Sequence, residues 1–129
     1  MMETTMLDKL RDRATRILAE TGRCTLSTTG PAGLQASMVL CTGQGTTLYV
    51  LIPDTSDHLF NLENEPNVAV TAETWRLHGT AAIVHDSPEL FAADQRQWHT
   101  IVRVTPVRLH ILPAQCGSAH QAETIDFDG

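Results

Sequence analysis

Short runs of β-forming residues, each bounded by turn residues, constrain the fold of this chain more than any other feature. Six such runs cover residues 23–28, 34–42, 46–52, 67–72, 75–85 and 101–112. Gly30-Pro31-Ala32-Gly33 joins the first two, and Gly43-Gln44-Gly45 joins the second and third. Strands of this length with turn-sized links are typical of antiparallel sheets, and closing about six of them into a barrel removes exposed edges. The sequence therefore predicts a mainly β fold with a few helices, organised as a six-stranded antiparallel barrel.

A first helix is expected before the strands. Thr4 or Thr5 can cap it, and Gly22 is placed to end it. Its apolar residues recur three, four and seven positions apart, which is the pattern of a helix with one buried face: Leu7, Leu10, Ala14, Ile17 and Leu18.

Two further helices are expected between strands. Thr55 or Ser56 can cap a short one, which Glu65-Pro66 stops. Ser87-Pro88-Glu89 is a cap followed by a proline at the first helical position, and it predicts a helix that reaches about Thr100. This helix would bury three apolar side chains, Leu90, Phe91 and Trp98.

Two positions within the strands predict irregular pairing. Gly79 interrupts the fifth strand, where a glycine often marks a bulge or a close approach of another backbone. The apolar residues of the last strand change parity at Pro106, which predicts a bulge or corner there. Residues 1–112 are expected to form the domain. The tail, 113–129, is polar, with Ile125 and Phe127 as its plausible anchors, and disorder and docking both stay open.

Charge and composition exclude several classes of partner. Nine Lys and Arg stand against fifteen Asp and Glu, a net charge of −6 that repels nucleic-acid phosphates and anionic membranes. The chain has no run of eighteen apolar residues and no secretory signal pattern. A soluble cytoplasmic protein, with no nucleic acid and no membrane among its partners, is expected.

Cysteine and histidine spacing predicts no metal site and no disulfide framework. The three cysteines, Cys24, Cys41 and Cys116, form no CxxC motif. The six histidines show no HxxxH or HExxH spacing: His58, His78, His85, His99, His110 and His120.

An ordered series of motifs resembles one known family. The pieces are Gln35-Ala36-Ser37-Met38-Val39-Leu40, the apolar strand to Ile52, Thr55-Ser56-Asp57-His58 with Asn61-Leu62, Asn64-Glu65-Pro66 with Val68, and Trp75 to Gly79 followed by Thr80-Ala81-Ala82-Ile83-Val84. In this order and spacing they resemble the pyridoxamine 5′-phosphate oxidase-like, FMN-binding split-barrel family over roughly Leu18 to Leu112. The resemblance implies a split barrel that works as a homodimer.

The same resemblance implies where flavin mononucleotide would bind. In this family the ring lies against the second strand at the dimer interface, and the phosphate lies near the loop and helix after the third strand. Carried over by position, the ring would be lined by Ser37, Met38, Val39, Leu40, Leu51 and Ile52. Thr55, Ser56 and His58 would face the phosphate, which a helix N-terminus also attracts through its unpaired N–H groups. Thr74 stands where the family places a glutamine directed at the ring.

Several positions depart from the oxidase itself. Asp57-His58 replaces a basic pair, Ser37 replaces an arginine, and Thr42 replaces a lysine. A carboxylate at Asp57 repels a phosphate, and a neutral imidazole attracts one only modestly. Oxidation of pyridoxamine 5′-phosphate is therefore not expected.

Two functions follow from the resemblance. The first is a flavin-dependent oxidoreductase that uses FMN, with an unidentified small-molecule substrate or electron donor and no side chain assigned as an obligatory acid or base. The alternative is a non-enzymatic split-barrel dimer that binds haem or another ligand. Residues 115–120, which include His120, are similar to a glycine-rich segment of haem-utilisation proteins.

Overall fold

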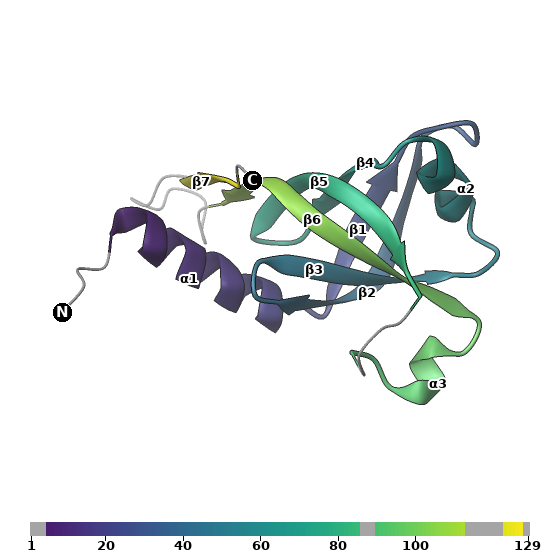
Figure 1. Ribbon diagram of the computed structural model, residues 1–129, viewed down its shortest axis with the longest axis horizontal. Helices are drawn as coiled ribbons and strands as arrows, with labels where there is room; N and C mark the ends of the chain where they lie inside the picture. The colour runs from purple at the N-terminus through teal and green to yellow at the C-terminus, as the bar shows by residue number, and fades with distance from the viewer. Residues whose placement is uncertain (1–4, 86–89, 113–122, 128–129) are drawn as a thin grey trace.

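In the described part of the chain, seven strands form one sheet, and six of them close into a barrel (Figure 1). The computed structural model describes residues 5–85, 90–112 and 123–127. The strands are β1 (Arg23–Thr28), β2 (Gln35–Gln44), β3 (Thr47–Pro53), β4 (Asn67–Thr71), β5 (Trp75–Val84), β6 (His99–Ile111) and β7 (Glu123–Asp126). Their order is β3-β2-β1-β4-β5-β6-β7, every pair is antiparallel, and an additional pairing of β3 with β6 closes the barrel. The predicted six-stranded antiparallel barrel is confirmed, with β7 as an additional strand.

The inner face of the barrel is filled by alternate apolar residues of every strand. On β3, for example, Leu48, Val50 and Ile52 are completely buried. Trp75 begins β5 with its ring fully buried, and its Nε1 donates a hydrogen bond to Thr21 Oγ1 at 3.0 Å. The indole therefore packs in the core while its one polar atom has a partner.

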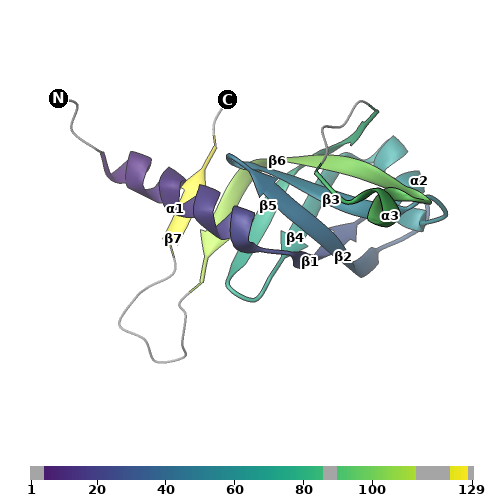
Figure 2. The same cartoon turned by 90° about the horizontal axis from the view of Figure 1, so that it is seen from below.

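Helix α1 (Met6–Glu20) covers one end of the barrel (Figures 1 and 2). Thr5, one of the two caps that the sequence allowed, is its N-cap and forms a capping box with Asp8. Ala14 and Leu18 are fully buried against the barrel. A Cβ at Gly43 of β2 would lie 2.6 Å from the backbone carbon of Leu18, so the absence of a side chain allows α1 to approach this strand.

The predicted bulge and the predicted close approach occur at the same place. Gly79 pairs with Pro106 while the preceding His78 pairs with Arg108, so Val107 is the extra residue of β6. A Cβ at Gly79 would lie 2.5 Å from the carbonyl oxygen of Thr105. The glycine in β5 and the change of parity at Pro106 in β6 therefore lie opposite each other in a single bulge.

The third predicted helix is wrong in length and in the burial of Trp98, although Phe91 is buried and Leu90 is half-buried as expected. Within the described residues α3 covers only Ala93–Arg96, and Trp98 is 77% exposed rather than buried. The helix ends early because the residues that follow it are in a strand: His99 and Thr100 pair with Pro53 and Ile52 of β3. Leu90 and Phe91 pack from an irregular segment onto Leu51 and Ile101, on the outer face of the barrel.

The two apolar residues predicted to anchor the tail do contact the core. Ile125 of β7 is 1% exposed, and Phe127 packs against the same cluster. The Phe127 N–H donates to the carbonyl of Val107, and Glu123 forms an ion pair with Arg13 of α1. The described part of the tail is thus docked beside β6 and α1 (Figure 2). Of the helices described, none is long and apolar enough to span a membrane.

Candidate functional site

The end of β3 and the start of α2 (Asp57–Asn64) form the end of the barrel opposite α1 (Figure 1). The chain turns sharply after Pro53, whose carbonyl accepts a hydrogen bond from the Ser56 N–H at 2.9 Å. Ser56 is the N-cap, and its Oγ accepts from the His58 N–H at 3.1 Å. Thr55 is exposed beside it. This is the local geometry in which a helix N-terminus presents partial positive charge to an anion.

An opening in the sheet lies next to this turn. The pairing of β2 with β3 runs from Gln44–Thr47 to Leu40–Leu51 and ends there. Residues 35–39 of β2 continue to pair with β1 on the other side. In the described part of the chain, this stretch of β2 therefore has backbone groups pointing away from β1 with no strand opposite them. We refer to residues 35–39 with Pro53 across the gap as the split edge.

Residues of β2 at and beside the split edge differ in exposure. Met38 is 71% exposed and Ser37 is exposed, whereas Val39 is buried in the core. Leu40 is half-buried and packs against the outer cluster around Leu51. Of these four predicted ring-lining residues, Met38 offers the largest accessible apolar surface.

The other predicted ring-lining residues are covered. Leu51 is 3% exposed beneath Phe91 and Ile101, and Ile52 is completely buried in the barrel. In a single chain these two residues shape the end of β3 by packing and do not present side chains to a ligand.

His58 points into the protein rather than toward the solvent side of the helix. It is 2% exposed, and its Nδ1 lies 2.8 Å from Thr28 Oγ1 of β1. Asn61 Nδ2 donates to the same hydroxyl at 3.1 Å, so the hydroxyl proton is available for His58 Nδ1. This network assigns the proton of the neutral ring to Nε2, which is buried and has no hydrogen-bond partner among the described residues. Burial lowers the pKa of the His58 imidazole, and the adjacent Asp57 carboxylate opposes part of that effect.

Asn61 belongs to the motif after β3 that carries the resemblance, but its positioning role is visible only in the structure. It is fully buried, and its hydrogen bonds connect α2 to the turn between β1 and β2. Its Nδ2 donates to the Gly33 carbonyl at 2.9 Å, and its Oδ1 accepts from the Ala32 N–H at 2.9 Å. The available signal was the spacing of His58 and Asn61, three residues apart on one helix face.

Thr74 is not brought to this site within one chain. It lies in the turn between β4 and β5 and lines a groove of about 300 Å³ together with Ile17 and Thr21 at the end of α1. Because α1 and α2 occupy opposite ends of the barrel, Thr74 and Ser56 are far apart in the molecule (Figure 1).

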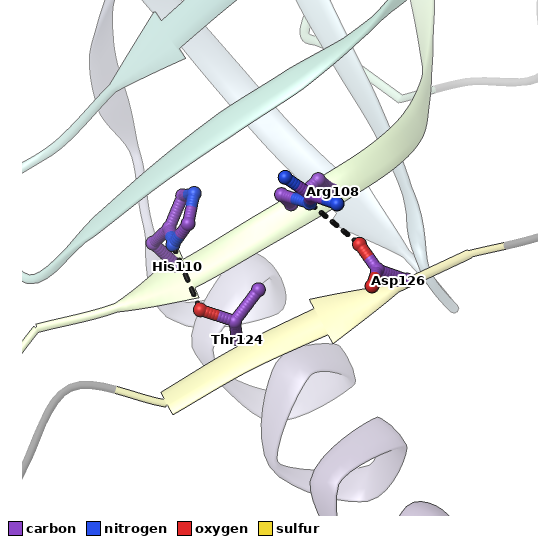
Figure 3. Close-up of polar contacts among 4 residues, drawn as sticks. All are labelled: Arg108, His110, Thr124 and Asp126. Atoms are coloured by element: carbon purple, nitrogen blue, oxygen red, sulfur yellow. Dashed lines mark hydrogen bonds and ion pairs between the residues drawn. The ribbon is translucent and has the colours of Figure 1, made fainter.

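A second polar groove of about 360 Å³ lies on the outer face of β5, β6 and β7. Its lining comprises His78, Val107, Arg108, His110 and Asp126. Arg108 Nε donates to Asp126 Oδ1 at 2.6 Å, and His110 Nδ1 lies 2.9 Å from Thr124 Oγ1, as Figure 3 shows. Among the residues described, no three His, Cys, Asp or Glu side chains are grouped as a metal would require. The predicted haem-related segment, residues 115–120, lies outside the described part of the chain.

Comparison with solved structures places this fold among split-barrel proteins. General stress protein 26 from Bacillus anthracis superposes with a TM-score of 0.73 at 19% sequence identity, covering 92% of this chain and 98% of that one. A protein related to general stress protein 26, of the pyridoxinephosphate oxidase family, from Clostridium acetobutylicum has a TM-score of 0.68 at 13% identity, covering 92% and 94%. HutZ, the haem storage protein from Vibrio cholerae, has a TM-score of 0.58 at 18% identity, covering 83% and 95%.

These likenesses show the fold that the sequence resemblance implied. No family model matches the sequence. No curated protein matches it either.

Proposed function

We propose that this chain is an FMN-binding split-barrel protein that acts as a flavin-dependent oxidoreductase. The observation that carries the proposal is the position of the split edge beside the capped N-terminus of α2. A planar ring needs an apolar surface and backbone hydrogen-bonding groups, and the split edge offers both. A phosphate needs donors and positive potential, and the turn before α2 offers them.

The residues present fit the ring better than the phosphate. Met38 supplies exposed apolar surface, and the backbone of residues 37–39 supplies polar groups at the open side of β2. At the phosphate end, the Thr55 hydroxyl and the first N–H groups of α2 are suitable donors. Asp57 is exposed in the first turn and would repel the phosphate, and the ring of His58 is turned inward. We therefore expect weak affinity for FMN.

Bound flavin would supply the hydride or electron transfer of the proposed reaction. The chain's own residues would hold and shield it. Met38 and Leu40 would pack against the ring and exclude water, while Thr55 and the helix N-terminus would hold the phosphate. Hydride transfer to or from a flavin requires no protein acid or base, and the proposal assigns none.

The decisive experiment is a titration of the purified protein with FMN and with riboflavin, followed by visible absorbance and flavin fluorescence. We expect binding of both at about one flavin per chain. The Asp57→Lys variant should raise the affinity for FMN and leave the affinity for riboflavin, which has no phosphate, nearly unchanged. Asp12→Lys is the matched control, because Asp12 is exposed on α1 at the other end of the barrel. Failure of the wild-type protein to bind either flavin would overturn the proposal.

A second candidate is a ligand-binding dimer without redox activity, with haem as the ligand to test. The observation that favours it is the acidic first turn of α2, which disfavours a phosphate-bearing cofactor. One structural neighbour, from Vibrio cholerae, is a haem storage protein. Titration with haemin distinguishes the two candidates. A Soret band that persists through gel filtration, together with no retention of flavin, would favour the second.

A further inference from the structure

Trp98 has an unusual backbone conformation for a large side chain. Its φ is 63°, and it is the only residue other than glycine with a positive φ in the described part of the chain. A bulky side chain in this left-handed region is strained, and such strain is maintained only where the surroundings fix it. A glycine would satisfy the same turn without the strain.

The surroundings of Trp98 do fix its backbone. Its carbonyl accepts a hydrogen bond from the Asp54 N–H at 2.9 Å. Thr100 Oγ1 donates to Asp54 Oδ1 at 2.7 Å, and His99 pairs with Pro53. The turn between α3 and β6 is thereby attached to the turn between β3 and α2.

The side chain of Trp98 makes little packing contact within the described part of the chain. It is 77% exposed, so packing within this chain does not compensate for the strained backbone. Large exposed aromatic side chains are typical of surfaces that bind something, because the rings offer much contact area at low entropic cost.

The same hydrogen bond places Trp98 at the candidate site. Asp54 is followed by Thr55 and by Ser56, the cap of α2. Pro53 lies between two strands at this end of the barrel, with β6 on one side and the split edge of β2 on the other. Trp98 and the 71% exposed Met38 therefore lie on opposite sides of the end of β3.

From these observations we infer that Trp98 stacks on the planar ring of the flavin, forming the side of the ligand site opposite Met38. The inference rests on the proposed function and names a specificity residue for it. A ligand with a flat aromatic system is then preferred over an aliphatic one, because an indole face adds stacking to apolar contact. The strained backbone is the cost of presenting the indole outward from this turn.

Three variants of Trp98 test the inference with FMN as the probe. Trp98→Leu keeps apolar bulk but removes the aromatic plane, and it should bind FMN about tenfold more weakly. Trp98→Phe keeps an aromatic ring and should retain most of the affinity. Trp98→Gly relieves the backbone, so its thermal midpoint should equal or exceed that of the wild type while its FMN affinity falls. Phe60→Leu is the control, since Phe60 is an aromatic residue of α2 that is also half exposed.

Fluorescence of the bound flavin separates stacking from a merely structural role. An indole stacked on the ring quenches flavin emission by donating an electron to the excited flavin, whereas a phenyl ring does not, so emission per bound FMN should rise in both Trp98→Leu and Trp98→Phe while only Trp98→Phe keeps most of the affinity. Equal affinity and equal emission in wild type and Trp98→Leu would overturn this inference and leave the proposed function standing. Conversion of a flavin-free dimer to a monomer by Trp98→Leu would also overturn it, because Trp98 would then be a contact between two copies. Absence of any flavin binding by the wild type would overturn both.

Discussion

At His58, burial and hydrogen bonding fix one protonation state. Its Nδ1 accepts a hydrogen bond from Thr28 Oγ1, while Nε2 is buried without a partner in the part of the chain that the structure describes. Charging this ring would require a second proton at Nδ1, where the lone pair now accepts a hydrogen bond, at a position buried from solvent. Burial accordingly lowers the pKa of His58 below its ordinary value near 6.5.

The lowered pKa predicts that His58 destabilises the fold in acid. In the unfolded chain the imidazole binds a proton at about pH 6.5, while in the folded chain it does so only at lower pH. The unfolded state therefore binds more protons as the pH falls through 6.5, and the free energy of unfolding decreases in that window. Urea denaturation measures the free energy of unfolding at pH 7.5 and at pH 5.5. Its decrease between the two pH values should be larger for the wild type than for His58→Gln, which cannot titrate.

The informative quantity is the change in stability with pH in each protein, and not the difference in stability between wild type and His58→Gln at one pH. His58→Gln is expected to be less stable than wild type at pH 7.5, because the contact with Thr28 is altered. An equal loss of stability in both proteins between the two pH values would contradict the prediction. His85→Gln is a suitable control, since His85 is exposed.

Among the elements, the bulge between β5 and β6 depends on one missing side chain. A Cβ at Gly79 would meet the Thr105 carbonyl oxygen at 2.5 Å and the Thr105 carbonyl carbon at 3.1 Å. Thr105 pairs with Thr80 of β5 and lies one residue beyond the end of the ladder to β3, so its backbone atoms cannot move without disturbing the pairing of β6 with β5.

Gly79→Ala is therefore expected to lower the free energy of unfolding by about 1–3 kcal/mol, the usual cost of overpacking. Gly22→Ala is the matched control. A Cβ at Gly22 meets nothing within 4 Å and its backbone φ is not positive, so this change should be neutral or stabilising by less than about 1 kcal/mol. Urea denaturation of the two variants measures the difference. Equal stabilities would mean that β6 can shift at the bulge at little cost.

Elements with strong local signals were predicted well, and those decided by tertiary contacts were not. The caps at Thr5 and Ser56 have side-chain hydrogen bonds that depend on a few adjacent residues, so the sequence shows them directly. The segment that contains Trp98 carries a helix pattern, but pairing of the following residues with β3 ends the helix early. Strand β7 was missed because its four residues pair only with the end of β6. No local pattern shows such pairing.

On the scale of the whole molecule, the succession of short strands predicted the barrel. The positions of the candidate site residues were predicted less completely. The sequence identified which residues lie near the end of β3. It did not show that His58 points inward, or that Thr74 lies at the opposite end beside α1. Both depend on how the barrel closes. A ligand at the split edge could contact Thr74 only if a second copy of the chain supplied it. The expected homodimer would therefore be needed for Thr74 to take part in the site.

The outer face of β2, β1 and β4 suits a contact between two copies. Paired residues on this face are small, with Ala36, Ser27 and Ala69 in one row. Leu34 and Met38 border them, 76% and 71% exposed. The described helices cover other parts of the barrel, since α1 lies over one end, α2 lies at the other, and the segment containing α3 packs on the outer face of β3 and β6. A sheet face of small and apolar residues that no described helix covers is typical of a homodimer interface.

We therefore expect the protein to sediment at twice its chain mass of 14.1 kDa at micromolar concentration. Ala36→Arg places a long charged side chain at the centre of this face and should convert the dimer to a monomer. Ala19→Arg makes the same change on the exposed side of α1 and should leave the dimer intact. Analytical ultracentrifugation distinguishes these outcomes. If Ala36→Arg remains dimeric, the copies associate through another face than that of β2, β1 and β4.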